Sequence, residues 1–269
     1  MYRLVPSCLL AGLLTSSVSA QDPDEAARLA RARARGALLY AYDRAAWHGT
    51  DDLRTKLPGF AQRVGGYIVD GPAAAAHLTF FDKNANRAVY VARFAGEKLI
   101  EGKVLGSADD HTLSPLDLKM IAALATARQA MAADRAVFAC APQPFNTVVL
   151  PPDTAEGVIA VYFLTPQTSN DAIPMGGHYE VDVDAAGRAG AVRPFSKSCI
   201  AAPTHPKLPK GAKPSMFFIT SLLDSTPTEV HVFSSMALGL PIGVGTVGPP
   251  ARLWPVTGTS IGAPVTLKR

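Results

Sequence analysis

The first twenty residues decide how much of this chain is left to fold, and in which surroundings it folds. Arg3 supplies a positive charge, residues 4–14 are uncharged and almost all apolar, and residues 18–20 are small. These are the three parts of a cleavable export signal, and the apolar run is shorter than the about 20 residues that span a bilayer. We therefore expect cleavage between Ala20 and Gln21. That cleavage leaves 249 of the 269 residues as a soluble protein of the bacterial periplasm or the medium.

The composition of the chain is that of a globular protein. Hydrophobic residues make up 48% and charged residues 18% of it, and no later segment is long and charge-free enough to span a membrane. The net charge is only +4 over 269 residues, whereas a nucleic-acid-binding surface usually carries concentrated basic patches. We expect no nucleic-acid partner and no cofactor.

The spacing of apolar residues predicts an α+β fold, with two main helices packed on a largely antiparallel β-sheet. One helix is expected from about Asp22 to about Trp47, and a second begins with Ser114 as N-cap and Pro115 at its first position. Strands are expected at 67–70, 77–81, 88–94, 98–105, 147–150, 158–164, 178–184, 191–195, 216–221, 229–236, 242–247, 253–256 and 265–267. Tight-turn sequences at 83–86 and 95–98 predict that the first four strands form an antiparallel meander.

The segment Ala141-Pro142-Gln143-Pro144 is the best candidate for a linker inside the exported chain. It is too short to establish two independent domains. We expect a single α+β domain over residues 21–269, with residues 134–146 as the place where a subdomain boundary could fall.

Two cysteines remain once Cys8 is removed with the export signal, and they lie 59 residues apart. An even pair in an oxidising compartment usually forms a bond, so we predict a disulfide between Cys140 and Cys199. The alternative is a nucleophilic thiol at one of these positions, which His205 is the nearest histidine to activate.

Three catalytic motifs match in letters and fail in context. Residues 243–248 fit G-x-G-x-x-G, but two prolines follow where a dinucleotide site needs a helix. Residues 258–262 fit the nucleophile elbow G-x-S-x-G, but neither an acid nor a histidine follows. Thr204-His205-Pro206 resembles part of a zinc-protease motif and lacks two of its metal ligands.

The candidate site residues come from two segments in which ionisable and apolar residues alternate. Period two places the ionisable groups of a strand on one face. Imidazole and carboxylate groups together could bind a divalent metal or act as acid and base, whereas an ordinary strand with one solvated face gives the same alternation. Both interpretations stay open for His178, Glu180, Asp182 and Asp184 in the first segment and Glu229 and His231 in the second.

Two groups of basic residues could contact anionic lipids or anionic envelope polymers. Arg28, Arg31 and Arg35 share one helix face, and Lys207, Lys210 and Lys213 lie in an extended proline-rich segment. The alternative is that both are solvated surface, a helix face and a connecting loop.

Three short segments carry a resemblance: FNTVVLPP at 145–152, GGHY at 176–179 and PTEVHVF at 227–233. They resemble a group of exported bacterial proteins with no assigned activity, and the resemblance covers most of the exported chain. It implies export and one continuous fold, and it carries over no catalytic residue. The leading interpretation is a non-catalytic binding or structural protein of the periplasm or envelope. The alternative is a metal-assisted hydrolase that uses His178, Glu180, Glu229 and His231.

Overall fold

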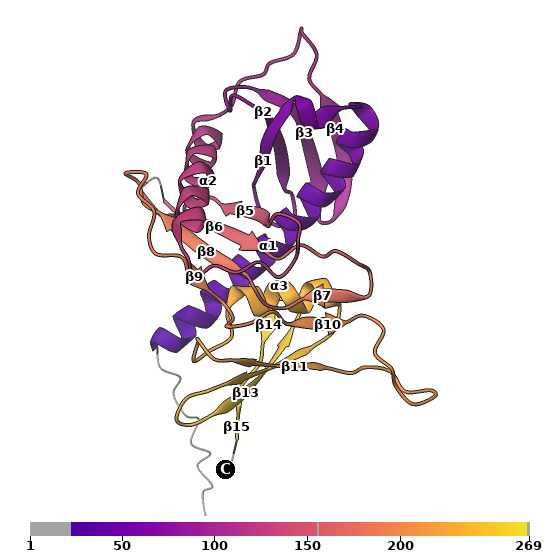
Figure 1. Ribbon diagram of the computed structural model, residues 1–269, viewed down its shortest axis with the longest axis vertical. Coiled ribbons are helices and arrows are strands. Elements are labelled where there is room, and N and C mark those ends of the chain that lie inside the picture. The colour runs from indigo at the N-terminus through magenta and orange to yellow at the C-terminus, as the bar shows by residue number, and fades with distance from the viewer. Residues whose placement is uncertain (1–22, 155, 268–269) are drawn as a thin grey trace, which may run out of the picture.

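The computed structural model describes residues 23–154 and 156–267, so the predicted export signal lies outside the described residues. The fold is α+β, as predicted, and the described residues form three α-helices and mostly antiparallel sheets. Helix α1 (Pro23–Lys56) runs diagonally across the molecule and contacts the meander sheet, the second sheet and helix α3 (Figure 1). No helix in the described ranges has the length and apolar character needed to cross a membrane.

Helix α1 continues nine residues beyond its predicted end at Trp47. The sequence Gly49-Thr50 suggests a stop, but Gly49 lies inside the helix, where the side chain of Leu78 occupies the space that a Cβ would need. The glycine therefore permits close packing of a strand on the helix. The extra turns place Leu53 in the core with no exposed surface.

The first four strands form the predicted antiparallel meander. Its order is β1 (Val64–Asp70), β2 (His77–Asp82), β3 (Ala88–Ala95) and β4 (Lys98–Val104). Short connections join neighbouring strands, as the turn sequences require. The sheet packs on the C-terminal half of α1.

Helix α2 (Pro115–Ala133) begins as the sequence predicts. The Asp117 backbone N–H donates to Ser114 Oγ at 3.1 Å, and the Ser114 N–H donates to Asp117 Oδ2 at 2.7 Å, so both sides of a capping box are made. Met120, Leu124 and Met131 are buried in the core, so this side of the helix packs against the sheets.

The second sheet forms the centre of the molecule. Its antiparallel order is β5 (Asn146–Leu150), β6 (Ile159–Leu164), β8 (Tyr179–Val183) and β9 (Arg193–Pro194). One face of the sheet packs on α2, and the other packs toward α1 and the meander. All six residues of β6 are buried, because both faces are covered. The strand predicted at 191–195 is shorter than expected, since β9 covers only Arg193–Pro194.

The C-terminal part contains the main error of the sequence analysis. The strand predicted at 229–236 is instead helix α3 (Glu229–Leu238), which ends at Gly239 with φ 66°. Every residue from Glu229 to Ser235 is buried, so the apolar residues do not mark a single helix face. The alternation of ionisable and apolar residues in this segment therefore does not separate a buried face from a solvated face. Thr228 before the helix and Gly239 after it are the cap residues that could have revealed it.

Helix α3 covers a mixed sheet that ends the chain. Its order is β11 (Phe217–Ser221), β12 (Ile242–Thr246), β13 (Arg252–Thr257) and β14 (Ser260–Ile261), with β15 (Val265–Thr266) also paired to β13. Strands β11 and β12 are parallel, as the intervening helix allows. The remaining strands, β7 (Ala172–Pro174) and β10 (Ala201–Pro203), form a separate antiparallel pair.

The predicted disulfide between Cys140 and Cys199 is present, with an S–S distance of 2.07 Å and a Cα–Cα distance of 5.5 Å. It ties the segment after α2 to the segment before β10. This bond removes the cysteine-nucleophile alternative, because neither thiol is free.

Candidate functional site

Two of the predicted site residues, Glu180 and Glu229, meet in a buried polar group that we call the Arg–Glu cluster (Arg35, Tyr162, Glu180, Arg193 and Glu229). The Tyr162 hydroxyl oxygen lies 2.8 Å from Glu180 Oε1 and 3.0 Å from Glu229 Oε1. Arg35 donates to Glu180 Oε1 at 2.9 Å and to the Tyr162 hydroxyl at 3.2 Å. On the other side, Arg193 donates to Glu180 Oε2 at 3.0 Å and lies 3.5 Å from Glu229 Oε1.

The fold assembles this cluster from five elements. Tyr162 on β6 and Glu180 on β8 are direct register partners, and Arg193 on β9 is the next partner of Glu180. Glu229 reaches the cluster because it is the first residue of α3. Helix α3 crosses α1 closely at Gly36, where a Cβ would lie 2.5 Å from Val232 Cβ. That close crossing brings Arg35 of α1 beside the sheet.

Burial sets the ionisation of the cluster. Burial raises the pKa of Glu229, and the neighbouring Glu180 carboxylate raises it further, against the lowering effect of Arg193. Burial, with Glu229 and Glu180, also raises the pKa of Tyr162 well above its usual range. Tyr162 is therefore a neutral hydroxyl at physiological pH.

The two predicted histidines are buried, and each binds a backbone N–H. His178 Nδ1 accepts from the Thr165 N–H at 3.0 Å, and His231 Nδ1 accepts from the Thr228 N–H at 3.0 Å. Burial lowers the pKa of His178 to about 4. Burial, together with His178 and Arg193, lowers the pKa of His231 to about 4. Both rings are therefore neutral acceptors that fix local backbone.

The two remaining ionisable residues of the 178–184 segment lie outside the core. The side chain of Asp182 is exposed. Asp184 Oδ2 forms an ion pair at 2.8 Å with Arg188 within a surface turn. Within the residues that the structure describes, no group of three or more His, Cys, Asp and Glu side chains is arranged to hold a metal ion.

A cavity of about 310 Å³, which we call the arginine pocket, lies over the Arg–Glu cluster. Arg28, Arg31 and Arg35 line it from α1, which places the predicted basic helix face against a concave surface. Glu180, Arg193 and Glu229 contribute the cluster side.

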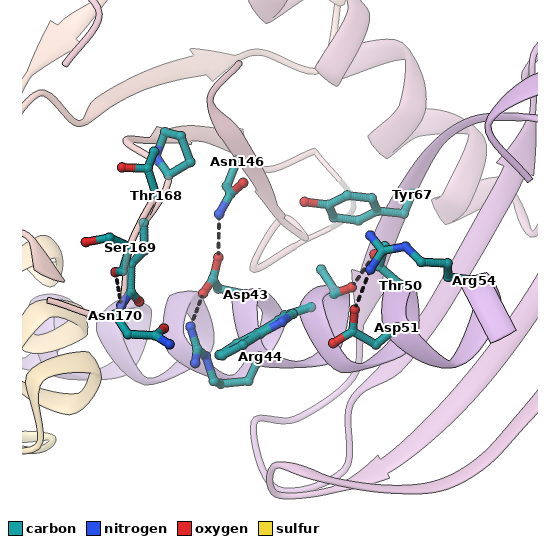
Figure 2. A pocket seen from close by; sticks show the side chains of 14 residues that line it. Asp43, Arg44, Thr50, Asp51, Arg54, Tyr67, Asn146, Thr168, Ser169 and Asn170 are labelled. Carbon is teal, nitrogen blue, oxygen red and sulfur yellow. Dashed lines mark hydrogen bonds and ion pairs between the residues drawn. The ribbon is translucent and has the colours of Figure 1, made fainter. Parts of the chain in front are cut away.

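A larger cavity of about 580 Å³, which we call the α1 cleft, was not predicted from the sequence. It lies between the middle of α1 and the loop 166–170, with Tyr67 of β1 and Asn146 of β5 also lining it (Figure 2). Trp47 is its large aromatic residue and is 50% exposed. The other lining groups are mostly hydroxyls and amides: Thr50, Asn146, Gln167, Thr168, Ser169 and Asn170.

The charged groups of the α1 cleft pair with one another. Arg44 donates to Asp43 Oδ2 at 3.0 Å and stacks over the Trp47 ring at 4.3 Å, and Arg54 pairs with Asp51 at 3.1 Å. The Asn146 amide lies 3.4 Å from Asp43 Oδ1 (Figure 2). Burial raises the pKa of Asp43, while Arg44 and Asn146 lower it. The cleft thus carries equal numbers of acidic and basic side chains, each with its counter-charge beside it.

The rejected motifs have structural roles. Residues 243–246 lie within strand β12, and residues 258–262 form the turn between β13 and β14 with strand β14 itself. Neither segment begins a helix, which confirms the rejection of both motifs. Lys207, Lys210 and Lys213 are exposed in the loop between β10 and β11.

Comparison with known proteins supplies no relative. No protein-family model, no curated protein and no solved structure matches the chain.

Proposed function

We propose that this chain is an exported, non-catalytic binding protein that takes a small, uncharged, hydroxyl-rich ligand, such as a sugar, in the α1 cleft. The observation that carries the proposal is the cleft itself. Its volume of about 580 Å³ falls within the range of about 300–1,000 Å³ that small-molecule sites occupy.

The lining of the cleft favours a neutral ligand. Asp43 pairs with Arg44 and Asp51 pairs with Arg54, so a charged ligand would have to compete with a counter-charge already in contact. The hydroxyl and amide groups of Thr50, Asn146 and the loop 166–170 offer both donors and acceptors. A sugar presents the same mixture of donors and acceptors, together with C–H surfaces that contact the exposed part of the Trp47 side chain.

Two features support a place outside the cytoplasm. The disulfide between Cys140 and Cys199 persists in oxidising compartments such as the periplasm. The first twenty residues have the composition of an export signal. No specific observation favours the metal-assisted hydrolase. Its two carboxyl groups, Glu180 and Glu229, contact arginines, and its two histidines accept hydrogen bonds from backbone N–H groups.

Tryptophan fluorescence gives a sharp test, because the chain holds two tryptophans of opposite exposure. Trp47 lines the cleft and is 50% exposed, whereas Trp254 is fully buried. Titration with neutral disaccharides such as maltose, trehalose and N,N′-diacetylchitobiose should change the emission of Trp47 in a saturable way. The Trp47→Phe variant should lose that change.

Two further variants locate the binding. Asn146→Ala removes an amide from the cleft wall and should weaken binding about tenfold, the worth of one to two hydrogen bonds. Asn170 is also in the cleft, so the matched control is the exposed Asn84→Ala, which lies in the turn between β2 and β3. Equal affinity in wild type and Asn146→Ala, or no saturable response to any neutral sugar, would count against the proposal.

A further inference from the structure

The Tyr162 hydroxyl has one hydrogen and faces two carboxyl groups. Its oxygen lies within 3.0 Å of both Glu180 Oε1 and Glu229 Oε1, while Arg35 donates to it at 3.2 Å. A hydroxyl donates one hydrogen bond and accepts two. If both carboxyls were ionised, one of them would face a lone pair of Tyr162 without a proton between the two oxygens.

The arrangement is satisfied when Glu229 carries a proton. Glu180 accepts from Arg35 at 2.9 Å and from Arg193 at 3.0 Å, so this carboxyl group has two guanidinium partners. Among the described residues, Arg193 is the one ion-pair partner of Glu229 within 4.0 Å, at 3.5 Å. A neutral Glu229 donates to the Tyr162 hydroxyl, and Tyr162 donates to Glu180. All three hydrogen-bonding positions of Tyr162 are then filled.

This proton leaves an excess of positive charge on the arginine pocket. Arg193 Nη2 pairs with Asp224 Oδ1 at 2.8 Å. The two positive charges of Arg35 and Arg193 therefore match the two carboxyl groups to which they donate hydrogen bonds, Glu180 and Asp224. Four arginines line the pocket together with Glu180, Asp182, Asp224 and Glu229, so a proton on Glu229 leaves the arginines in excess by one. Arg28 and Arg31 are both exposed, and neither forms an ion pair within 4.0 Å with a described residue.

We propose that the arginine pocket is a second binding site, which takes a small solute bearing a carboxylate or phosphate group through Arg28 and Arg31. These two residues lie three apart on α1, so their side chains are neighbours on one helix face. Guanidinium groups recognise carboxylate and phosphate oxygens with paired hydrogen bonds. Arg35, one turn further along, stays bound to Glu180 and closes the floor of the pocket.

The shape of the site favours a small solute over a flat membrane surface. The arginines line a cavity of about 310 Å³, together with Thr226, Thr228 and Glu229. A phosphate group fits such a cavity, either as the free ion or as part of a lipid headgroup. These two sources share one chemistry and are separated by experiment.

The test is isothermal titration of the full exported chain with inorganic phosphate, at constant ionic strength set with sodium chloride. We expect saturable binding that weakens about tenfold or more in Arg28→Ala/Arg31→Ala, because each arginine supplies charge-assisted hydrogen bonds to the phosphate oxygens. Both residues are exposed, so the variant should fold normally. Arg135→Ala, exposed and remote from the pocket lining, is the matched control and should keep wild-type affinity.

A second arm uses vesicles of phosphatidylglycerol. Sedimentation with vesicles that depends on Arg28 and Arg31, without any saturable binding of free phosphate, would overturn the solute site in favour of a membrane contact. Phosphate binding of equal strength in wild type and the double variant would overturn the site altogether. The Glu229→Gln variant keeps a neutral group beside Tyr162 and should bind phosphate within about twofold of wild type. A much tighter affinity in that variant would refute the neutral state of Glu229.

Discussion

Acid should destabilise this protein through His178 and His231. Burial lowers the pKa of each ring from 6.5 to about 4. Between these two pH values, the unfolded chain binds more protons than the folded chain, so the free energy of unfolding falls as pH falls. For such a pair of pKa values, lowering the pH from 7 to 5 costs about 2 kcal/mol per histidine, and about 4 kcal/mol for both.

Asparagine variants isolate this effect. Both rings accept a backbone N–H at Nδ1, and the side-chain oxygen of asparagine can replace that acceptor without titrating. Urea unfolding of wild type at pH 7 and at pH 5 should show the loss, and His178→Asn/His231→Asn should show much less of it. Glu229 acts in the opposite sense, because its pKa is raised, and the comparison of variants cancels its contribution. His205→Asn, in an exposed loop, is the control. If wild type and the double variant lose the same stability, the histidines do not titrate as their burial requires.

Three further predictions concern the packing of α1 on α3, the disulfide and the export signal. Gly36→Ala should destabilise the fold by about 1–3 kcal/mol in urea unfolding, since its Cβ would lie 2.5 Å from both Cβ and Cγ1 of Val232 and 2.8 Å from the backbone oxygen of Glu229; an unchanged midpoint would contradict the close helix crossing. Replacing Cys140 and Cys199 by alanine should cost about 4 kcal/mol, and thiol titration of the unfolded, unreduced protein should find no free thiol; two free thiols would refute the bond. Mass spectrometry of protein recovered from the producing cell should find an N-terminus at Gln21, and an intact Met1 would contradict the export signal.

Local signals in the sequence predicted the elements whose boundaries they mark. The Ser114 and Pro115 pair located the start of α2, and the turns at 83–86 and 95–98 predicted the meander of β1 to β4. The disulfide followed from the number of cysteines and the expected compartment. Each of these signals is short-range or compositional, so it survives without knowledge of the tertiary packing.

Features that depend on tertiary packing could not be predicted from local sequence patterns. Residues 229–235 of α3 are all buried, so the segment has no apolar stripe at helical spacing that could have revealed the helix. Glu180 and Glu229 were identified as candidates, but their arginine partners come from α1 and β9, far away in the chain. The α1 cleft is lined by residues near 43–54, 67, 146 and 166–170, and no local pattern connects these segments.

The most direct test of the proposed function is an amide-resolved NMR titration with the neutral sugar that changes Trp47 fluorescence most strongly. The account predicts that shifts concentrate in residues 43–54 of α1, in Asn146 and in the loop 166–170, which together line the cleft. It also predicts that the amide signals of residues around the arginine pocket keep their chemical shifts, since a neutral ligand does not require Arg28 or Arg31. Shifts that leave the α1 cleft untouched, or that centre on the arginine pocket, would contradict the central claim.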